Sequence, residues 1–372
     1  VATVSGSDGN YTIDTSTLNS GPYRIEMTVP QGYTSAPFGT VTQSSVRQKV
    51  LVGSENIDFA ILDASIYCAS NPRLISSCFA AGDGKIAGTG AAATAPKAAI
   101  KAFRFDDTGY PGSPDYNAPT VLNTQADVGT VYGLGYSKVT KKVYEGAFLR
   151  RHAGIGSAGV GAIYEVDAAT GAISRTITIP NVGSEPTGRD LSGNVNSASR
   201  DINAFSAVGK VSLGDVDVIG DGNTLITTNL NTRSLVVVSN LSTTTDINSY
   251  SLPASVTCPG GTGDRRIFGT GSKTVGGLLK AYVGVTCTGE TNNSAAELVG
   301  KIVEFDIATN TWGPVVLSFP LNYTKGCALI NSFSGNMGCT WKPWSDNPSD
   351  AQAVQILATF WGVSNPQPII SE

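Results

Sequence analysis

The chain has 372 residues, a net charge of −4 and 15 % charged residues, fewer than the roughly 25 % of an average soluble domain. Lys and Arg form no run interleaved with aromatic residues, which argues against a nucleic-acid partner, and no apolar stretch approaches the ~18 residues of a membrane-spanning helix. The length predicts two or three domains, and the 43 glycines, together with many Ser, Thr and Asn, are typical of β-structure rich in turns.

The first sixty residues predict three strands. A turn (DGN) precedes a strand at Tyr11–Ile13, residues 21–30 (GPYRIEMTVP) alternate between apolar and polar side chains, and residues 56–61 (NIDFAI) form the third strand. The order of DGNYT, GPYRIEMTVPQGY and NIDFAI resembles the B-type immunoglobulin-like stalk modules of bacterial surface proteins, of the Cna and serine-aspartate-repeat type. The resemblance implies an exported bacterial protein with such a module at residues 1–63.

The DGNYT turn stands so near the start that the leading strands of such a module are missing. A module without them exposes an unpaired sheet edge, to which a strand can be added. The added strand can come from a neighbouring molecule or from another part of the same polypeptide. We therefore expect residues 1–63 to act as a joint in an assembly.

Six cysteines fall into three close pairs, the first of them in a linker predicted at residues 64–98. Pairing neighbours closes the shortest loops, which suits staples of hairpins and loops. Reduced thiols and a zinc site are the alternatives, but the chain has no Cys-x-x-Cys motif and a single histidine. The predicted disulfides imply an oxidising compartment. They are Cys68–Cys78, Cys258–Cys287 and Cys327–Cys339.

Residues 99–372 predict strands almost throughout, with few helical signals. In two places a strand ends at Asp, a four-residue turn closes on Gly or Asn, and a new strand begins, as in the outer hairpin of a propeller blade. These turns begin at Asp167 and Asp306, and a degenerate copy follows Leu235. Asp suits the first position because its carboxylate accepts backbone N–H groups, and Gly or Asn suits the last because it tolerates positive φ.

The expected fold class is therefore all-β. It consists of a partial immunoglobulin-like stalk module followed by a β-propeller whose blade number stays open. Strands within the propeller are predicted at residues 99–105, 142–148, 161–166, 234–238 and 301–305.

Arg150, Arg151 and His152 stand together before a Gly-rich loop. They are candidates for binding an anionic sugar or a phosphate, and a solvated loop is the alternative. A triad of the Ser-His-Asp kind would have to use His152, but no Gly-x-Ser-x-Gly elbow occurs in the chain. The pattern G-x-G-x-x-G at 154–159 precedes a strand rather than a helix, which argues against a dinucleotide site.

Residues 208–225 resemble the inner strand and turn of lactonase-like propellers, in which an Asp-Gly-Asn turn leads into Thr-Leu. Asp215 and Asp217 share one face of this strand, and Asp221 follows in the turn. Three carboxylates converging there would bind Ca²⁺, which prefers oxygen ligands. The alternative is that these aspartates accept hydrogen bonds from the backbone of the neighbouring blade.

Trp341 and Trp344 lie in a loop beside Cys339 and are candidates for stacking on glycans, with packing inside the protein as the alternative. Four Asn-x-Ser/Thr sequons predict surface loops. They begin at Asn10, Asn240, Asn292 and Asn322.

Together these features predict an extracellular, cell-surface structural or adhesive protein without enzymatic activity, for instance a subunit of a surface filament or sheath. The expected partners are copies of the chain, other surface proteins and glycans; nucleic acid and direct membrane insertion are not expected. The alternative is a calcium-dependent propeller hydrolase of the lactonase or glycan-active type. Paired carboxylates for such a hydrolase are available at Glu145, Glu165, Asp201 and Asp215.

Overall fold

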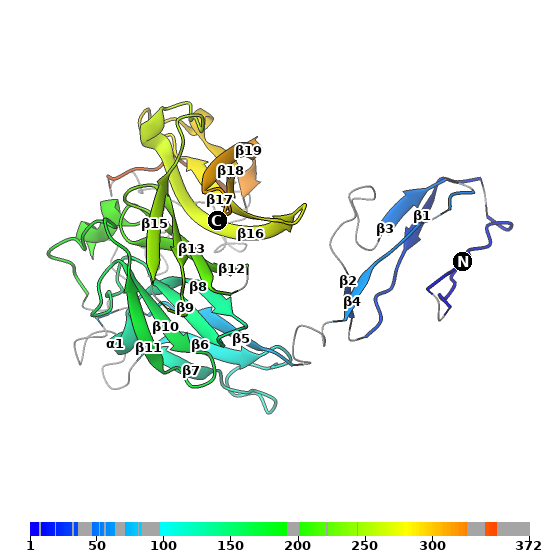
Figure 1. Ribbon diagram of the computed structural model, residues 1–372, viewed down its shortest axis with the longest axis horizontal. Coiled ribbons are helices and arrows are strands. Elements are labelled where there is room, and N and C mark those ends of the chain that lie inside the picture. Colours follow the sequence, from blue (N-terminus) through cyan, green and yellow to red (C-terminus); the bar gives the residue numbers. More distant parts are fainter. Residues whose placement is uncertain are drawn as a thin grey trace. The chain divides into compact units, whose positions relative to one another are not determined.

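The computed structural model divides the chain into two compact units (Figure 1). The first unit comprises Val1–Leu74 and Arg104–Asn117, and the second comprises Ile75–Phe103 and Ala118–Glu372. The structure describes residues 1–6, 9–18, 20–31, 33–35, 47–51, 53–55, 57–63, 71–80, 82–83, 97–191, 201–220, 222–243, 245–325 and 339–347.

The first unit contains two separate antiparallel strand pairs. Strand β1 (Tyr23–Glu26) pairs with β3 (Arg47–Val50), and β2 (Tyr33–Ser35) pairs with β4 (Ile61–Asp63). Val50 is the one buried hydrophobic side chain among the residues described in this unit. An immunoglobulin-like sandwich needs two larger sheets packed face to face, so these pairs do not support that module.

Only the second of the three strands predicted in this unit is found as a strand within its predicted range. Residues 11–13 are not a strand, and β4 begins where the third predicted strand was to end, at Ile61. The first and third predicted strands are instead joined at Tyr11, whose hydroxyl donates a hydrogen bond to the carbonyl of Ile57 at 2.5 Å. The two segments thus meet through a side chain instead of a backbone ladder.

The second unit contains three four-stranded antiparallel sheets in which each strand pairs with the next along the chain (Figure 1). A three-stranded sheet precedes them, and the four-residue helix α1 (Gln125–Val128) leads into the first of the three. The sheets are β5 (Arg73–Ser77), β6 (Ala98–Arg104) and β7 (Thr120–Thr124); β8 (Val131–Ser137), β9 (Lys142–Ala147), β10 (Ala162–Asp167) and β11 (Ile173–Thr178); β12 (Leu213–Ile219), β13 (Thr224–Asn229), β14 (Ser234–Ser239) and β15 (Asp246–Ser251); and β16 (Arg265–Val275), β17 (Leu278–Cys287), β18 (Val299–Asp306) and β19 (Thr311–Pro320), followed by the pair β20 (Thr324–Lys325) and β21 (Cys339–Thr340).

The first strands of neighbouring sheets lie side by side and run in the same direction. A Cβ on Gly133 of β8 would stand 2.3 Å from the backbone nitrogen of Val216 in β12, and one on Gly135 would meet Val218. The two contacts advance together along both strands, so β8 and β12 are parallel. Glycine is required at position 133 because the two backbones approach too closely for a side chain.

Strand β16 continues this arrangement. The carboxylate of Asp215 accepts a hydrogen bond from the Thr270 backbone at 3.2 Å, and that of Asp217 accepts one from the Ser272 hydroxyl at 3.4 Å. Consecutive four-stranded meanders with parallel first strands are the architecture of a β-propeller. The all-β, propeller prediction is therefore confirmed, as are strands within all five predicted propeller segments.

The predicted hairpin turns are confirmed in detail. Asp167 Oδ1 accepts the backbone N–H groups of residues 169 and 170, and Asp306 Oδ1 accepts those of residues 308 and 309. The turns close at Gly171 and Asn310, with φ of 78° and 56°. The turn of the predicted degenerate copy joins β14 to β15 and passes through Asn240, at φ 57°.

Apolar cores fill the space between successive sheets, and burying such side chains is the main force holding the blades together. The largest fully buried side chains include Tyr144, Ile163, Leu213, Leu225, Leu235 and Phe305. All four sequon asparagines are exposed, as predicted. Within the described part of the chain, no helix is long and apolar enough to span a membrane.

Candidate functional site on the loop face

One end of the propeller gathers four of the eight residues that the sequence marks for ligand or metal binding: Arg150, Arg151, His152 and Trp344. Because β8, β12 and β16 are parallel and every sheet is antiparallel, the loops that enter each sheet and those between its second and third strands meet at this end. We call this end the loop face. It comprises residues 125–130, 148–161, 179–191, 201–212, 230–233, 252–264 and 288–298, together with Arg266, Trp344 and Asp346, which contact them.

A buried ion pair organises the part of the loop face around Arg150–His152. Arg189 donates to both carboxylate oxygens of Asp201, at 3.2 and 2.6 Å, and the two side chains are 4 % and 0 % exposed. The same carboxylate accepts the backbone N–H of His152 at 2.7 Å. Arg189 also donates to the backbone carbonyls of Arg150 and Ala153, at 2.6 and 3.0 Å. The ion pair therefore holds the whole turn in place.

The electrostatics of this cluster follow from its burial. Burial lowers the pKa of His152, and the neighbouring charge of Arg151 lowers it further, so the imidazole is neutral near pH 7. Burial alone would lower the pKa of Arg189, but the hydrogen bonds and charges of Asp201 and Glu185 raise it. A charged guanidinium matched by a carboxylate satisfies both groups inside the protein.

The predicted ligand-binding cations at this site contact aromatic rings of the protein itself. The guanidinium of Arg150 lies 4.0 Å from the ring centre of Phe79, and that of Arg151 lies 5.6 Å from Phe205. Cation–π contacts of this kind stabilise a loop by about 0.5–1 kcal/mol where solvent reaches them. Arg150 is exposed and Arg151 buried, so Arg150 is the member of the predicted set that a ligand can reach.

A second polar cluster on the loop face surrounds Trp344. Lys210 forms ion pairs with Glu290 at 3.3 Å and with Asp346 at 2.8 Å, and Arg266 pairs with Glu290 at 2.5 Å. Trp344 is 4 % exposed, and its indole N–H donates to Asp346 at 3.2 Å. Trp344 is thus packed inside this cluster, in line with the packing alternative.

Trp341 is half-buried and lies against the exposed Tyr323, with ring centres 5.9 Å apart. This pair presents an aromatic edge at the surface, which keeps glycan stacking at Trp341 as a prediction. The sequence alone does not distinguish the two tryptophans, because both stand in the same short loop.

Asp215 and Asp217 lie on β12 at the border with the next sheet. Both contact β16 through the hydrogen bonds to Thr270 and Ser272, which favours the alternative of inter-blade bonding over a calcium site. Burial raises the pKa of each carboxyl, and the charge of Asp215 further raises that of Asp217. Asp221, the third predicted ligand, lies outside the described residues.

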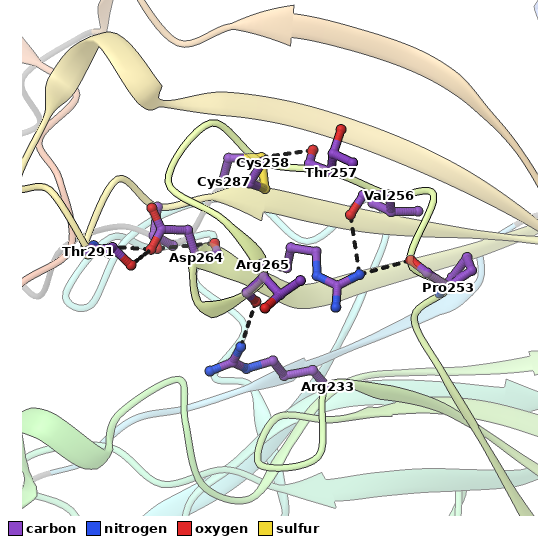
Figure 2. Close-up of a disulfide and its surroundings, with 11 residues drawn as sticks. Arg233, Pro253, Val256, Thr257, Cys258, Asp264, Arg265, Cys287 and Thr291 are labelled. Carbon is purple, nitrogen blue, oxygen red and sulfur yellow. Dashed lines mark hydrogen bonds between the residues drawn. A yellow bond between two sulfur atoms is a disulfide. The ribbon is translucent and has the colours of Figure 1, made fainter.

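The disulfide Cys258–Cys287 ties the loop before β16 to the end of β17 (Figure 2). Its Cα atoms are 5.4 Å apart, an ordinary span for a disulfide. This predicted pair is confirmed. Cys78 forms no disulfide with any described residue. Cys68 and Cys327 lie outside the described residues, so the two other predicted pairs stay predictions.

We expect the double variant Cys258→Ala/Cys287→Ala to lose about 3–4 kcal/mol of unfolding free energy, because the bridge closes a loop across 29 residues. Urea titration followed by tryptophan fluorescence measures the loss. A variant as stable as the natural chain would contradict the expectation. Cys78→Ala serves as the control and is expected to change stability by less than about 1 kcal/mol.

Sequence reasoning missed Arg189, Lys210, Arg266 and Glu290 as members of the loop face. They stand in Gly- and Ser-rich connections or at strand ends, where no periodic pattern marks a residue. Their partners are far away in sequence, for instance 80 residues from Lys210 to Glu290. A signal for such pairs is absent from a single sequence because only the packing of one sheet against the next brings them together.

No family model matches the chain. Among curated proteins it is similar to Colossin-B of Dictyostelium discoideum, at 24 % identity over 330 residues, covering 86 % of the chain and 8 % of the relative. It is also similar to Colossin-C of the same organism, at 24 % identity over 343 residues, covering 90 % and 32 %. The chain thus spans less than a third of each of these relatives. They do not support the bacterial origin that the stalk-module resemblance implied.

Solved structures with partial similarity include a protein from Lactobacillus plantarum, at 12 % identity, a TM-score of 0.32 and coverage of 69 % of both chains. Another is a putative 6-phosphogluconolactonase from Bacteroides fragilis, at 12 % identity, a TM-score of 0.29 and coverage of 64 % of this chain and 67 % of the other. The fold assignment rests on the strand topology described above.

Proposed function

We propose that this chain is part of an extracellular structural or adhesive protein that works through assembly and carries no catalytic centre. The first unit is the joint, and the propeller is a durable body displayed by it. The observation that carries the proposal is the small extent of regular structure in the first unit, with two strand pairs and one buried hydrophobic side chain among its described residues.

Such a unit gains stability from a partner. Isolated two-stranded sheets are marginal in water, and three or more strands or a packed face are needed for independent stability. Among the described residues neither strand pair has a third strand, so the backbone donors and acceptors of its outer edges suit strand addition. A partner that adds a strand would also bury exposed apolar side chains of this unit. They include Val4, Leu18, Tyr33, Leu51 and Ile61.

The propeller supports the same proposal because several of its charged side chains pair with one another. Arg189 forms an ion pair with Asp201, and Lys210 forms one with Glu290. The disulfide at Cys258 supports an oxidising, extracellular address.

Light scattering on the intact chain without reductant tests the proposal. We expect the mean particle mass to rise with protein concentration, and to stay that of a monomer when residues 1–63 are deleted. The deletion leaves every residue of the second unit in place. Circular dichroism and the mass of the Cys258–Cys287 peptide pair check that the shortened chain is folded.

Two results would refute the proposal. One is an intact chain that remains monomeric at every concentration. The other is a shortened chain that assembles as well as the intact one, which would place the joint in the propeller.

A further inference from the structure

On the loop face, Asp264 and Glu297 each have one buried carboxylate oxygen that lacks a hydrogen-bond partner. Asp264 is 0 % exposed; its Oδ1 accepts the backbone N–H of Thr291 at 3.0 Å and the hydroxyl of the same residue, but Oδ2 accepts nothing. Glu297 ends the short 3₁₀ turn Ala295–Glu297. Its Oε1 accepts the side-chain amide of Asn292 at 2.9 Å, while its buried Oε2 accepts nothing.

Gly260 shows that these two oxygens border one small space. A Cβ built on Gly260 would stand 1.9 Å from Asp264 Oδ2 and 2.9 Å from Glu297 Oε2. The oxygens are therefore no further apart than the total of these two distances. The backbone of Gly260 is outside the left-handed region, so glycine is needed here for space and not for conformation.

The neighbouring cationic side chains bind other groups, although the charge of Asp264 acts on Arg233 and opposes the lowering of the Arg233 pKa by burial. Arg233 donates to the carbonyl of Thr262 at 2.9 Å, and Arg265 donates to the carbonyls of Pro253 and Val256 at 2.8 and 3.2 Å (Figure 2). Arg266 pairs with Glu290. Among the described residues, no cationic side chain forms an ion pair with Asp264 or Glu297. Two carboxylates this close repel each other unless something positive lies between them.

We propose that Asp264 and Glu297 together bind one divalent cation of the calcium class through Oδ2 and Oε2. Calcium takes carboxylate oxygens at 2.3–2.6 Å, so two oxygens on one ion lie within about 5 Å of each other. Thr291 and Asn292 hold the second oxygen of each carboxylate, which orients the first toward the ion, as outer-shell partners do in metal sites. This site differs from the predicted one at Asp215, Asp217 and Asp221.

The cation would link two loops that are separate in the sequence. Asp264 ends the loop that starts after β15 and contains the Cys258–Cys287 disulfide, and Glu297 lies in the loop between β17 and β18. The disulfide and the ion would fix the same loop at two points. This inference is independent of assembly through the first unit.

Calorimetric titration of CaCl₂ into the intact chain, freed of metal with EDTA and then dialysed, tests the site. We expect one bound ion per chain, and a loss of at least tenfold in affinity in Glu297→Gln, Asp264→Asn and Gly260→Ala. The half-exposed Glu297 makes Glu297→Gln the mildest change to the fold. We also expect saturating CaCl₂ to raise the melting temperature of the natural chain but not of Glu297→Gln, because a ligand that binds the folded state stabilises it.

The double variant Asp215→Asn/Asp217→Asn is the matched control, since it removes two carboxylates from the rival position. It is expected to bind calcium as the natural chain does. The proposal is overturned if the natural chain shows no calcium binding. It is also overturned if binding is lost in the control and kept in Glu297→Gln.

Discussion

Replacing Glu145 by Gln is expected to stabilise the propeller at neutral and alkaline pH, and to remove most of the loss of stability that the natural chain suffers as pH rises. Glu145 lies on β9, is 0 % exposed, and neither carboxylate oxygen has a hydrogen-bond partner. Burial raises its pKa from 4.5 to about 8. An ionised carboxylate in this position is strongly disfavoured, and a neutral amide of the same shape is disfavoured much less.

The direction of the pH effect follows from the two pKa values. Between about 4.5 and 8 the unfolded chain has released the proton of Glu145 and the folded chain retains it. Stability therefore falls with rising pH across this window, by about 1.4 kcal/mol per pH unit and about 5 kcal/mol in total, and levels off above it. The raised pKa values of Asp215 and Asp217 act in the same direction, so the difference between variant and natural chain isolates Glu145.

Urea unfolding followed by tryptophan fluorescence at several pH values between 4 and 9 measures this difference. All four tryptophans lie in the propeller part of the sequence, so the signal reports that unit. The exposed Glu55 provides the control, and Glu55→Gln is expected to leave the pH profile unchanged. Equal pH profiles for the natural chain and Glu145→Gln would show that Glu145 titrates normally.

The hairpins of the propeller are predictable because their causes are local. Asp167 and Asp306 meet the backbone groups that they bind within three residues, so the pattern appears in a short stretch of sequence. The burial of Glu145 has no such signal. Strand β9 is covered on both faces, so its side chains do not alternate between buried and exposed, and a carboxylate there looks like any strand residue.

The loop face was predictable only in part, for the same reason. Arg150–His152 and Trp344 stand out by residue type, but their partners come from other connections. Whether a cation is free for a ligand depends on those partners. In the first unit a local pattern again predicts a strand, since alternation at residues 21–30 predicts β1 correctly. The resemblance to a stalk module, however, implied a larger sandwich than the described strands form.

Asp201→Ala is expected to cost about 3–5 kcal/mol, because removing the buried partner leaves the charge of Arg189 in the interior with only the partly exposed Glu185 to compensate it. It also leaves the backbone N–H of His152 without its acceptor. Asp201→Asn is expected to cost less, because an amide oxygen still accepts one of these hydrogen bonds. Asn also tolerates the left-handed backbone of this residue, at φ 50°.

The partner of Arg189 at the surface gives the matched control. Glu185 pairs with the same guanidinium at 2.8 Å but is 31 % exposed, so Glu185→Gln is expected to cost less than about 1 kcal/mol. In the double variant Asp201→Ala/Arg189→Met neither charge of this ion pair remains, and its stability is expected to exceed that of Asp201→Ala alone. If the double variant were less stable than Asp201→Ala by the full cost of Arg189→Met, the two side chains would act independently, and the ion pair would not be what holds Arg150–His152 in place.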